Sequence, residues 1–232
     1  MKRFKHYSFD LWMTLIRSNP DFKKQRTKYF FNHFNYKGKT LDEVGIIFRQ
    51  IDVMCNAINE KTGSNIDSEE MYLMVISAVN DYTFALHDID IEDVYTKMEE
   101  LLLEYLPVPF SNETLPSLWK LKDAGGATFS LLSNTGFIKG RTLRKVLKAL
   151  GLEAYFDFQI YSDEEGMSKP NAALFELLIR KTKQTRAEEL GNYKEIIHIG
   201  DNVMADIHSA EKAGISSLLI NSNNQSILNL LD

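Results

Sequence analysis

Tyr7-Ser-Phe-Asp10-Leu-Trp-Met-Thr-Leu15 places an acid at the end of a short apolar segment that favours a buried strand. A carboxylate at the carboxyl end of a buried strand is costly unless neighbouring groups stabilise its charge. An Asp at a strand-to-loop boundary is also an ordinary turn residue, and this stretch alone favours that interpretation. A reactive carboxylate here therefore requires partners elsewhere in the chain.

From residue 112 onward, the sequence predicts short buried strands that alternate with helices. The expected strands are 127–132, 158–161, 196–199 and 217–220. The helices between them are expected around 115–124, 143–150, 175–178 and 205–213. Such alternation indicates a parallel sheet with helices on both faces. We therefore predict an α/β fold with a doubly wound parallel sheet, in which ligands bind at the carboxyl ends of the strands.

Polar residues follow several of these strands at or just beyond their ends. They are Ser133, Asn134, Lys169, Asp201 and Asp206. Taken singly, the Ser-Asn pair and the first Asp are expected to cap helices, and the Lys and the second Asp to be solvated. Their order and spacing, together with Asp10, favour a shared functional site instead. His198, within an apolar strand, is expected to be a hydrogen-bonded core residue and not a ligand.

The set has the chemistry that a carboxylate nucleophile needs to attack a phosphoryl group. Asp10 is the candidate nucleophile, and Asp10 and Asp201 offer hard oxygen ligands for Mg²⁺, which usually binds few carboxylates. Lys169 can balance the negative charge and hold Asp10 ionised. Because the attacked group is an anion, positive charge is required at such a site.

The remaining residues can orient the substrate and the metal. The Ser133 hydroxyl and the backbone N–H of Asn134 can bind phosphoryl oxygens at the start of the following helix. Asp206 can orient a metal-bound water or a ligand from behind the direct ligands.

Between the first strand and the next, the sequence is patterned for helices. The expected helices are about 22–34, 44–58, 68–86 and 91–105. The second of them begins at a capping box, Thr40-Leu-Asp-Glu43. Proline-containing linkers flank the region at 17–20 and 106–110. We therefore expect residues 16–108 to form an inserted helical-bundle domain, with residues 1–15 and 109–232 forming the α/β core domain.

The composition is that of an ordinary globular chain. Its 232 residues are 44% hydrophobic and 25% charged, with a net charge of −5. This charge argues against a non-specific binder of nucleic acid or anionic membranes, and no apolar run approaches the length of a membrane span. The single cysteine, Cys55, cannot form an internal disulfide. We expect a cytoplasmic protein that acts on a small molecule, with neither nucleic acid nor membrane as partner.

These motifs resemble those of haloacid dehalogenase-like (HAD) superfamily hydrolases with an inserted helical cap. The resemblance covers residues 5–15 and about 113–221, and the cap matches by placement and helicity only. It implies a Rossmann-like core, Asp10 as nucleophile, a covalent aspartyl intermediate, and a cap that closes over the substrate. Gly200-Asp-Asn-Val-Met-Ala-Asp206 resembles the metal-binding fourth motif of the family's phosphatases.

Trp12 departs from the pattern of these phosphatases, which carry an Asp two residues after the nucleophile. That Asp protonates the leaving group and later activates water, and an indole has no titratable proton for either step. Loss of a general acid/base typically costs about 10²–10⁴ in rate. The backbone carbonyl of Trp12 is retained as the metal ligand that the family uses at this position, and Met13 replaces the usual Gly. The dehalogenase branch has Tyr there and works without metal.

Three hypotheses remain for the function. We favour a Mg²⁺-dependent phosphohydrolase that acts through an aspartyl-phosphate intermediate on a small phosphorylated substrate with a good leaving group, or with an acid supplied from elsewhere. A 2-haloacid dehalogenase-type hydrolase of a halogenated substrate is the second, supported by the bulky aromatic residue at Trp12. The third is a non-catalytic member that binds a phosphorylated ligand or a protein. Substrate contacts are expected from Trp12, Ser133, Asn134 and Lys169.

Overall fold

Five parallel strands form the central sheet of the computed structural model, which describes residues 4–186 and 190–231. They are β1 (His6–Phe9), β4 (Thr128–Ser133), β5 (Phe158–Tyr161), β6 (Ile196–Gly200) and β7 (Ser216–Leu219). Their order across the sheet is β5-β4-β1-β6-β7, and all neighbouring pairs are parallel. The predicted α/β fold with a doubly wound parallel sheet is confirmed, and the bounds of the expected strands are correct to within one residue.

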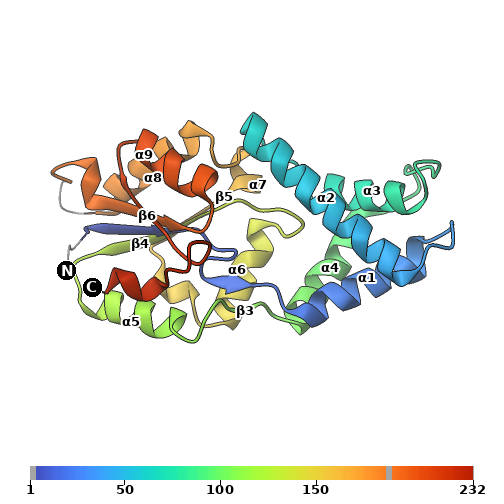
Figure 1. Ribbon diagram of the computed structural model, residues 1–232, viewed down its shortest axis with the longest axis horizontal. Coiled ribbons are helices and arrows are strands. Elements are labelled where there is room, and N and C mark those ends of the chain that lie inside the picture. The colour runs from blue at the N-terminus through green and yellow to red at the C-terminus, as the bar shows by residue number, and fades with distance from the viewer. Residues whose placement is uncertain (1–3, 187–189, 232) are drawn as a thin grey trace.

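Helices cover both faces of this sheet (Figure 1). The longer ones are α5 (Thr114–Asp123) and α6 (Gly140–Ala149) on one face, and α8 (Ala172–Thr185) with the short α9 (Ser209–Lys212) on the other. Short helical turns are η1 (Glu153–Tyr155), α7 (Ser162–Glu165), η2 (Tyr193–Glu195), η3 (Val203–His208) and η4 (Ile227–Leu230). Alternation along β4 explains the two layers, because Phe129 and Leu131 pack with α5 and α6 whereas Leu132 packs with α8 and α9.

The strand order places β1 at the centre of the sheet. Phe9 lies opposite Leu131 of β4 on one side and Ile199 of β6 on the other. The chain proceeds from β1 to β4 and β5 in one direction and then returns to β6 and β7 in the other. Such a reversal opens a crevice at the carboxyl ends of the strands, and Asp10 lies at this position.

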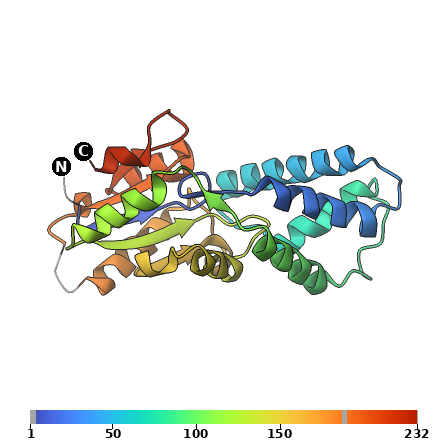
Figure 2. The same cartoon turned by 90° about the horizontal axis from the view of Figure 1, so that it is seen from below.

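Four helices occupy the stretch between β1 and β4 and extend beyond the ends of the strands (Figures 1 and 2). They are α1 (Pro20–Phe34), α2 (Leu41–Thr62), α3 (Ser68–Val79) and α4 (Ile91–Glu104), and we call residues 20–104 the helical segment. The predicted capping box at Thr40 is confirmed. None of the described helices combines the length and apolarity needed to cross a membrane.

The prediction of a helix through residue 86 is wrong, because α3 ends at Val79. The side-chain amide of Asn80 donates to the carbonyl oxygens of Phe34 and Ile76, at 2.7 and 2.8 Å. These bonds satisfy carbonyl groups at the ends of two helices, and the next two residues adopt positive φ angles that no helix can continue.

The two linkers that flank the helical segment are paired with each other. β2 (Ile16–Arg17) and β3 (Val108–Pro109) form a small antiparallel sheet, separate from the central one. The side-chain amide of Asn19 also donates to Leu106 O at 3.2 Å. The sequence suggested only loops here, because strands of two residues carry no detectable periodicity. The chain therefore enters and leaves the helical segment at one place.

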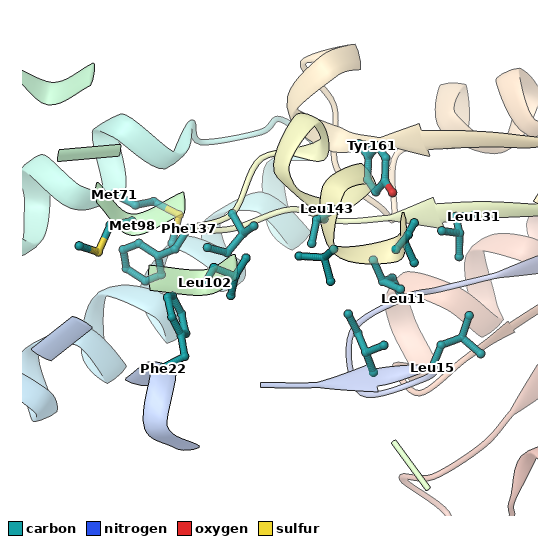
Figure 3. Close-up of a cluster of buried hydrophobic side chains, with 14 of the residues drawn as sticks. Leu11, Leu15, Phe22, Met71, Met98, Leu102, Leu131, Phe137, Leu143 and Tyr161 are labelled. Atoms are coloured by element: carbon teal, nitrogen blue, oxygen red, sulfur yellow. The ribbon is translucent and has the colours of Figure 1, made fainter. Parts of the chain in front are cut away.

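The hydrophobic core continues from the sheet into the helical segment. Figure 3 shows labelled members of this cluster from Met71 and Met98, past Phe137, to Leu131 of β4 in the sheet. Phe137 lies in the loop between β4 and α6, and the hydroxyl of Tyr72 on α3 donates to its carbonyl oxygen at 3.1 Å. The loop thus anchors the helical segment to the sheet through a buried aromatic ring.

His6, the first residue of β1, is fully buried in a hydrogen-bonded position. Its Nδ1 and Nε2 atoms each lie 2.8 Å from a hydroxyl, those of Thr128 and Ser130. Its ring also stacks on Phe158. Burial lowers the pKa of His6 from 6.5 to about 3. The ring therefore stays neutral in the folded protein at pH values where the unfolded chain binds a proton.

We predict that His6 makes the fold sensitive to acid. Its stabilising effect is complete above the unfolded-state pKa of 6.5 and is lost as the pH falls from there towards about 3, by up to about 1.4 kcal/mol per pH unit. Urea unfolding should show that His6→Gln loses less stability than the wild type over this range. As a control, His87→Gln removes a histidine whose side chain is 76% exposed and should keep the wild-type slope. Identical slopes for all three proteins would contradict the assignment.

Candidate active site

Asp10 lies at the carboxyl end of β1, buried at the edge of the sheet where the strand ends converge. Its backbone N–H donates to Ile199 O at 2.8 Å, which extends the pairing with β6 by one residue. The Thr14 hydroxyl donates to Asp10 Oδ2 at 3.0 Å. Burial raises the pKa of Asp10, and the adjacent ammonium of Lys169 opposes this effect. The predicted nucleophile is thus held by a hydroxyl on one oxygen and a cation on the other.

Lys169 is buried between two carboxylates, and the alternative of a solvated loop charge is wrong. Its Nζ donates to Asp10 Oδ1 at 2.8 Å and to Asp206 Oδ1 at 2.6 Å. Burial alone would lower the pKa of Lys169, but the two carboxylates raise it above its ordinary value. The lysine is therefore a permanent cation at the centre of the site.

Asn134 fixes the backbone of Lys169. Its Oδ1 accepts from Lys169 N at 2.7 Å, and its Nδ2 donates to Lys169 O at 3.0 Å. The end of β4 is thereby joined to the loop before α8, which explains how two loops far apart in the sequence keep a fixed separation.

Asp206 is buried behind the other carboxylates, in a π-helical turn and not in the α-helix expected from the sequence. Its Oδ1 lies 3.2 Å from His198 Nε2 as well as accepting from Lys169, and its Oδ2 accepts from Asn202 N at 3.0 Å. Despite burial, Lys169 and His198 hold the pKa of Asp206 below its ordinary value. The interpretation of Asp206 as a solvated residue is wrong, since it is an ionised group that supports Lys169.

Asp201 follows β6 and is half-buried. Its Oδ1 is 3.5 Å from the Thr14 hydroxyl, a longer separation than those at Asp10 and Asp206. Burial and the charges of Asp10 and Asp206 raise the pKa of Asp201 to about 7. Asp201 is therefore the carboxylate of the site whose charge the protein compensates least.

The donor set of the site fits Mg²⁺. One carboxylate oxygen each of Asp10, Asp201 and Asp206 lie within 4.8 Å of one another. Hard oxygen atoms of this kind suit Mg²⁺, and three carboxylates face only one ammonium. Both oxygens of Asp206 already accept hydrogen bonds, whereas Asp201 is nearly free of them. Asp201 is therefore the carboxylate best suited to bind a metal directly, and Asp206, with three such contacts, is the least suited.

Ser133 and Asn134 do not lie at a helix start, and that expectation is wrong. Helix α6 begins only at Gly140, because the intervening loop carries Phe137 into the helical segment. The carboxylate of Asp163 accepts from Gly140 N at 3.1 Å, which satisfies the helix end by other means. Ser133 is buried and its hydroxyl donates to Asn134 O at 3.1 Å, while Asn134 lines the cavity described below.

Trp12 and Met13 lie beside Asp10 in the loop that follows β1. Trp12 is half-buried, and both residues line the cavity. Met13 has a φ of +60°, in the left-handed region that favours glycine. Its side chain is half exposed. Met13, in place of the usual Gly, therefore keeps the left-handed conformation of this loop at the cost of backbone strain.

A cavity of about 1210 Å³ opens at the strand ends, between the sheet and the helical segment. The predicted site residues that line it are Asp10, Trp12, Asn134, Lys169, Asp201 and Asp206. Helices α1 and α2 supply much of the opposite wall, including Arg26, Arg49 and Glu60. Ser133 is the one predicted site residue that does not line this cavity.

The sequence did not reveal the contacts of the site with helix α2. Glu60 Oε1 accepts from Asn202 Nδ2 at 2.6 Å, beside the turn that holds Asp206. At the end of the same helix, Gly63 O accepts from Ser168 N at 3.0 Å, next to Lys169. No motif marks these residues, because only the tertiary fold brings them to the site. His198 was expected to be a hydrogen-bonded core residue, which is confirmed, but its contact with Asp206 was not foreseen.

Comparisons with known proteins agree on one family. A sequence model of haloacid dehalogenase-like hydrolases matches residues 4–214. Haloacid dehalogenase-like hydrolase domain-containing protein 3 of Xenopus laevis is 26% identical over 60% of this chain and 53% of that protein. Ribulose-1,5-bisphosphate 5-phosphatase of Halopiger xanaduensis is 28% identical over 73% of this chain and 65% of that protein. The chain thus spans about half to two thirds of the length of these relatives.

A solved structure shows the same fold. The HAD-hydrolase YfnB of Bacillus subtilis, in a magnesium-bound form, superposes with a TM-score of 0.70 at 18% identity. The match covers 97% of this chain and 92% of that one, so the likeness includes the helical segment as well as the sheet.

We predict that Gly200 is required by the position of Asp206. A Cβ at Gly200 would lie 2.1 Å from Asp206 Oδ2, so Gly200→Ala must displace the carboxylate. Such overpacking should lower the free energy of unfolding by about 1–3 kcal/mol. Gly191→Ala is the control, because a Cβ there would meet Glu195 Oε1 at an accommodating 3.4 Å. Denaturant unfolding that shows equal stability for both variants would contradict the placement of Asp206.

Proposed function

The chain belongs to the haloacid dehalogenase-like hydrolase family, and we propose that it is a Mg²⁺-dependent phosphohydrolase of a small phosphorylated substrate. The observation that carries this proposal is the charge balance of the site. Three carboxylates gather around one ammonium, and the least compensated of them, Asp201, has its pKa raised to about 7. A divalent cation would restore the balance and would also favour the approach of an anionic phosphoryl group.

Asp10 is the proposed nucleophile. One of its carboxylate oxygens attacks the phosphorus atom, an O–P bond forms, and the bond from phosphorus to the leaving oxygen breaks with its electron pair. Water then attacks the aspartyl phosphate, which releases inorganic phosphate and regenerates Asp10. Lys169 keeps its proton throughout and stabilises the negative charge that gathers around Asp10.

The metal would be held by the carboxylates of Asp10 and Asp201 and by the backbone carbonyl of Trp12. When bound, it supplies positive charge that polarises phosphoryl oxygens and shields them from the attacking carboxylate. Asp206 acts from behind these ligands by fixing Lys169 and the backbone of Asn202. Asn134, which lines the cavity, and the hydroxyl of Ser133, once turned from the Asn134 carbonyl, would hold the other phosphoryl oxygens.

The helical segment is the proposed cap. In this arrangement residues 16–108 form an inserted cap domain, and residues 1–15 with 109–232 form the core domain. The pairing of β2 with β3 at the junction and the shared cavity support this division. The cap excludes water from the site and supplies the residues that select the substrate.

A carbon–halide hydrolase is the second candidate, and Trp12 favours it. A halide leaves without a proton, so the lack of a proton donor at Trp12 does not slow that reaction. Metal dependence separates the two candidates, because three carboxylates around one cation suit a phosphohydrolase that binds Mg²⁺. Turnover of any kind excludes the third candidate, a non-catalytic member that only binds a ligand or a protein.

The test is a screen of aryl, alkyl and acyl phosphates and of 2-haloacids, each with and without Mg²⁺. The proposal expects release of phosphate only with Mg²⁺ and its loss in Asp10→Asn. Metal-independent release of halide would replace it with the second candidate. Binding without turnover on every substrate would favour the third.

We predict that Asp201→Asn weakens Mg²⁺ binding without unfolding the core, because it removes a direct ligand that has few other partners. Titration calorimetry should show at least about a tenfold loss of affinity, because loss of even a residue that only supports a metal ligand typically costs about 10- to 100-fold. Asp42→Asn is the control, since Asp42 is an exposed acid that lines the same cavity. Equal Mg²⁺ affinity in Asp201→Asn and in the wild type would exclude Asp201 as a ligand.

We predict a steep dependence of rate on the pKa of the leaving group, because Trp12 provides no proton. Aryl and acyl phosphates should be hydrolysed faster than alkyl phosphates, by a margin on the order of the 10²–10⁴ that a general acid contributes. Slow hydrolysis of the aspartyl intermediate should also produce a pre-steady-state burst.

Trp12→Asp should raise the activity on alkyl phosphates, provided that loss of the indole leaves the loop folded. Trp12→Asn is the matched control, because asparagine has the size of aspartate but no titratable proton. Circular dichroism should first confirm that both variants fold. If the native enzyme hydrolyses alkyl and aryl phosphates equally fast with chemistry rate-limiting, another residue supplies the proton, and the argument from Trp12 is wrong.

A further inference from the structure

Arg26 of helix α1 is a cation on the cap side of the cavity. Its guanidinium carbon lies 4.1 Å from the ring centroid of Phe48 and 5.0 Å from that of Phe137. The ring of Phe22 lies 5.6 Å away. The side chain is half-buried. Three rings from two helices and one core loop therefore set the direction of the guanidinium.

Arg26 forms no ion pair among the described residues, although the charge of Asp52 acts on it at longer range. Among the other cations of the cavity, the buried Lys169 is paired with Asp10 and Asp206, and the exposed Arg49 is paired with Asp52 at 3.1 Å. The Nε atom of Arg26 is buried and makes no hydrogen bond. Burial also lowers the pKa of Arg26. Aromatic rings replace only part of the hydration that a guanidinium loses, so this position is costly without an anion.

We propose that Arg26 binds a second anionic group of the substrate, a carboxylate or a phosphate, remote from the phosphoryl group held at Asp10. The inference rests on the proposed function and extends it to a class of substrate with two negatively charged ends. The cavity of about 1210 Å³ holds much more than one phosphoryl group, and Arg26 and Asp10 both line it.

The chemistry of arginine suits this role. Its planar fork of N–H donors binds carboxylate and phosphate oxygens in pairs, and a guanidinium fixed by stacked rings loses little freedom on binding. The phenyl rings offer no acceptor that competes with an incoming anion. Arg26 would therefore select substrates by charge at the end that does not react.

A purely structural role predicts a different result. Arg26 then only packs α1 and α2 against Phe137, and its removal lowers stability without changing selectivity. The test therefore compares two substrates of the same shape, para-carboxyphenyl phosphate and its uncharged analogue para-carbamoylphenyl phosphate. Phenylene bisphosphate provides the arm in which the second group is a phosphate.

Arg26→Met keeps most of the apolar stem and removes the charge. The preference of kcat/KM for the carboxylate over the carboxamide should fall by about 10- to 100-fold relative to the wild type, chiefly through KM. Effects of the leaving group cancel, because the same two substrates are compared in each protein. The preference over the carboxamide is measured for the carboxylate and for the bisphosphate. The compound whose preference falls more in Arg26→Met identifies the anion that Arg26 binds. An unchanged preference in both arms would overturn the proposal.

Two further variants keep the result interpretable. Lys24→Met removes an exposed cation from the same helix and cavity wall, and should leave the preference within about twofold of the wild type. An equal loss of preference in Lys24→Met would show a long-range effect of charge, and would overturn the proposed contact between Arg26 and the anion. Arg26→Lys keeps the charge without the fork and should retain part of the preference. If Arg26→Met does not fold, Arg26→Lys decides alone, and its full wild-type preference would overturn the forked contact.

Binding measurements distinguish failure of the proposed function from failure of the anion site. Calorimetry of the two phosphates with each variant measures discrimination without turnover. Hydrolysis of neither compound, together with tighter binding of the carboxylate that depends on Arg26, would reject the phosphohydrolase and keep the anion site. Equal binding of the two compounds by the wild type would overturn the anion site.

Discussion

The ammonium of Lys169, buried between Asp10 and Asp206, is the interaction on which the rest of the site depends. Without it, two carboxylates would share a buried space, and breaking a buried pair by removing one partner typically costs about 3–5 kcal/mol. The three residues come from three different segments, the loop after β1, the loop before α8 and the π-helical turn after β6. One cation therefore holds together the strand ends whose convergence creates the site.

The position of this cation is set partly from the helical segment. Gly63 O, at the end of α2, accepts from Ser168 N and from Asn171 Nδ2, both at 3.0 Å, on either side of Lys169. Gly63 has a φ of +71°, and a Cβ there would approach Asn171 to 3.2 Å. The loop that carries Lys169 is thus hydrogen-bonded to the end of helix α2. The position of α2 and the arrangement of charge at Asp10 therefore depend on the same backbone contacts.

The sequence predicted the parts of this arrangement that depend on local patterns. Runs of apolar residues located the strands, and parallel topology leaves few places for Asp10, Lys169 and Asp201 other than one edge of the sheet. The late start of α6 was not predictable, because the loop before it is shaped by the aromatic cluster that Phe137 enters. Glu60 and Arg26 were also missed, since a charged residue on a helix is ordinarily solvated and only the packing of α1 and α2 over the strand ends turns them inward.

The small sheet of β2 and β3 constrains how the two parts of the molecule can move. An insertion joined by two separate flexible strands could tilt and slide in any direction. Here the entering and leaving chains are paired side by side, so the helical segment is attached to the sheet at one place. Phe137, from the loop after β4, packs within the helical segment against Phe48 and Tyr72. Any change in the angle between the helical segment and the sheet would therefore have to break these aromatic contacts of Phe137.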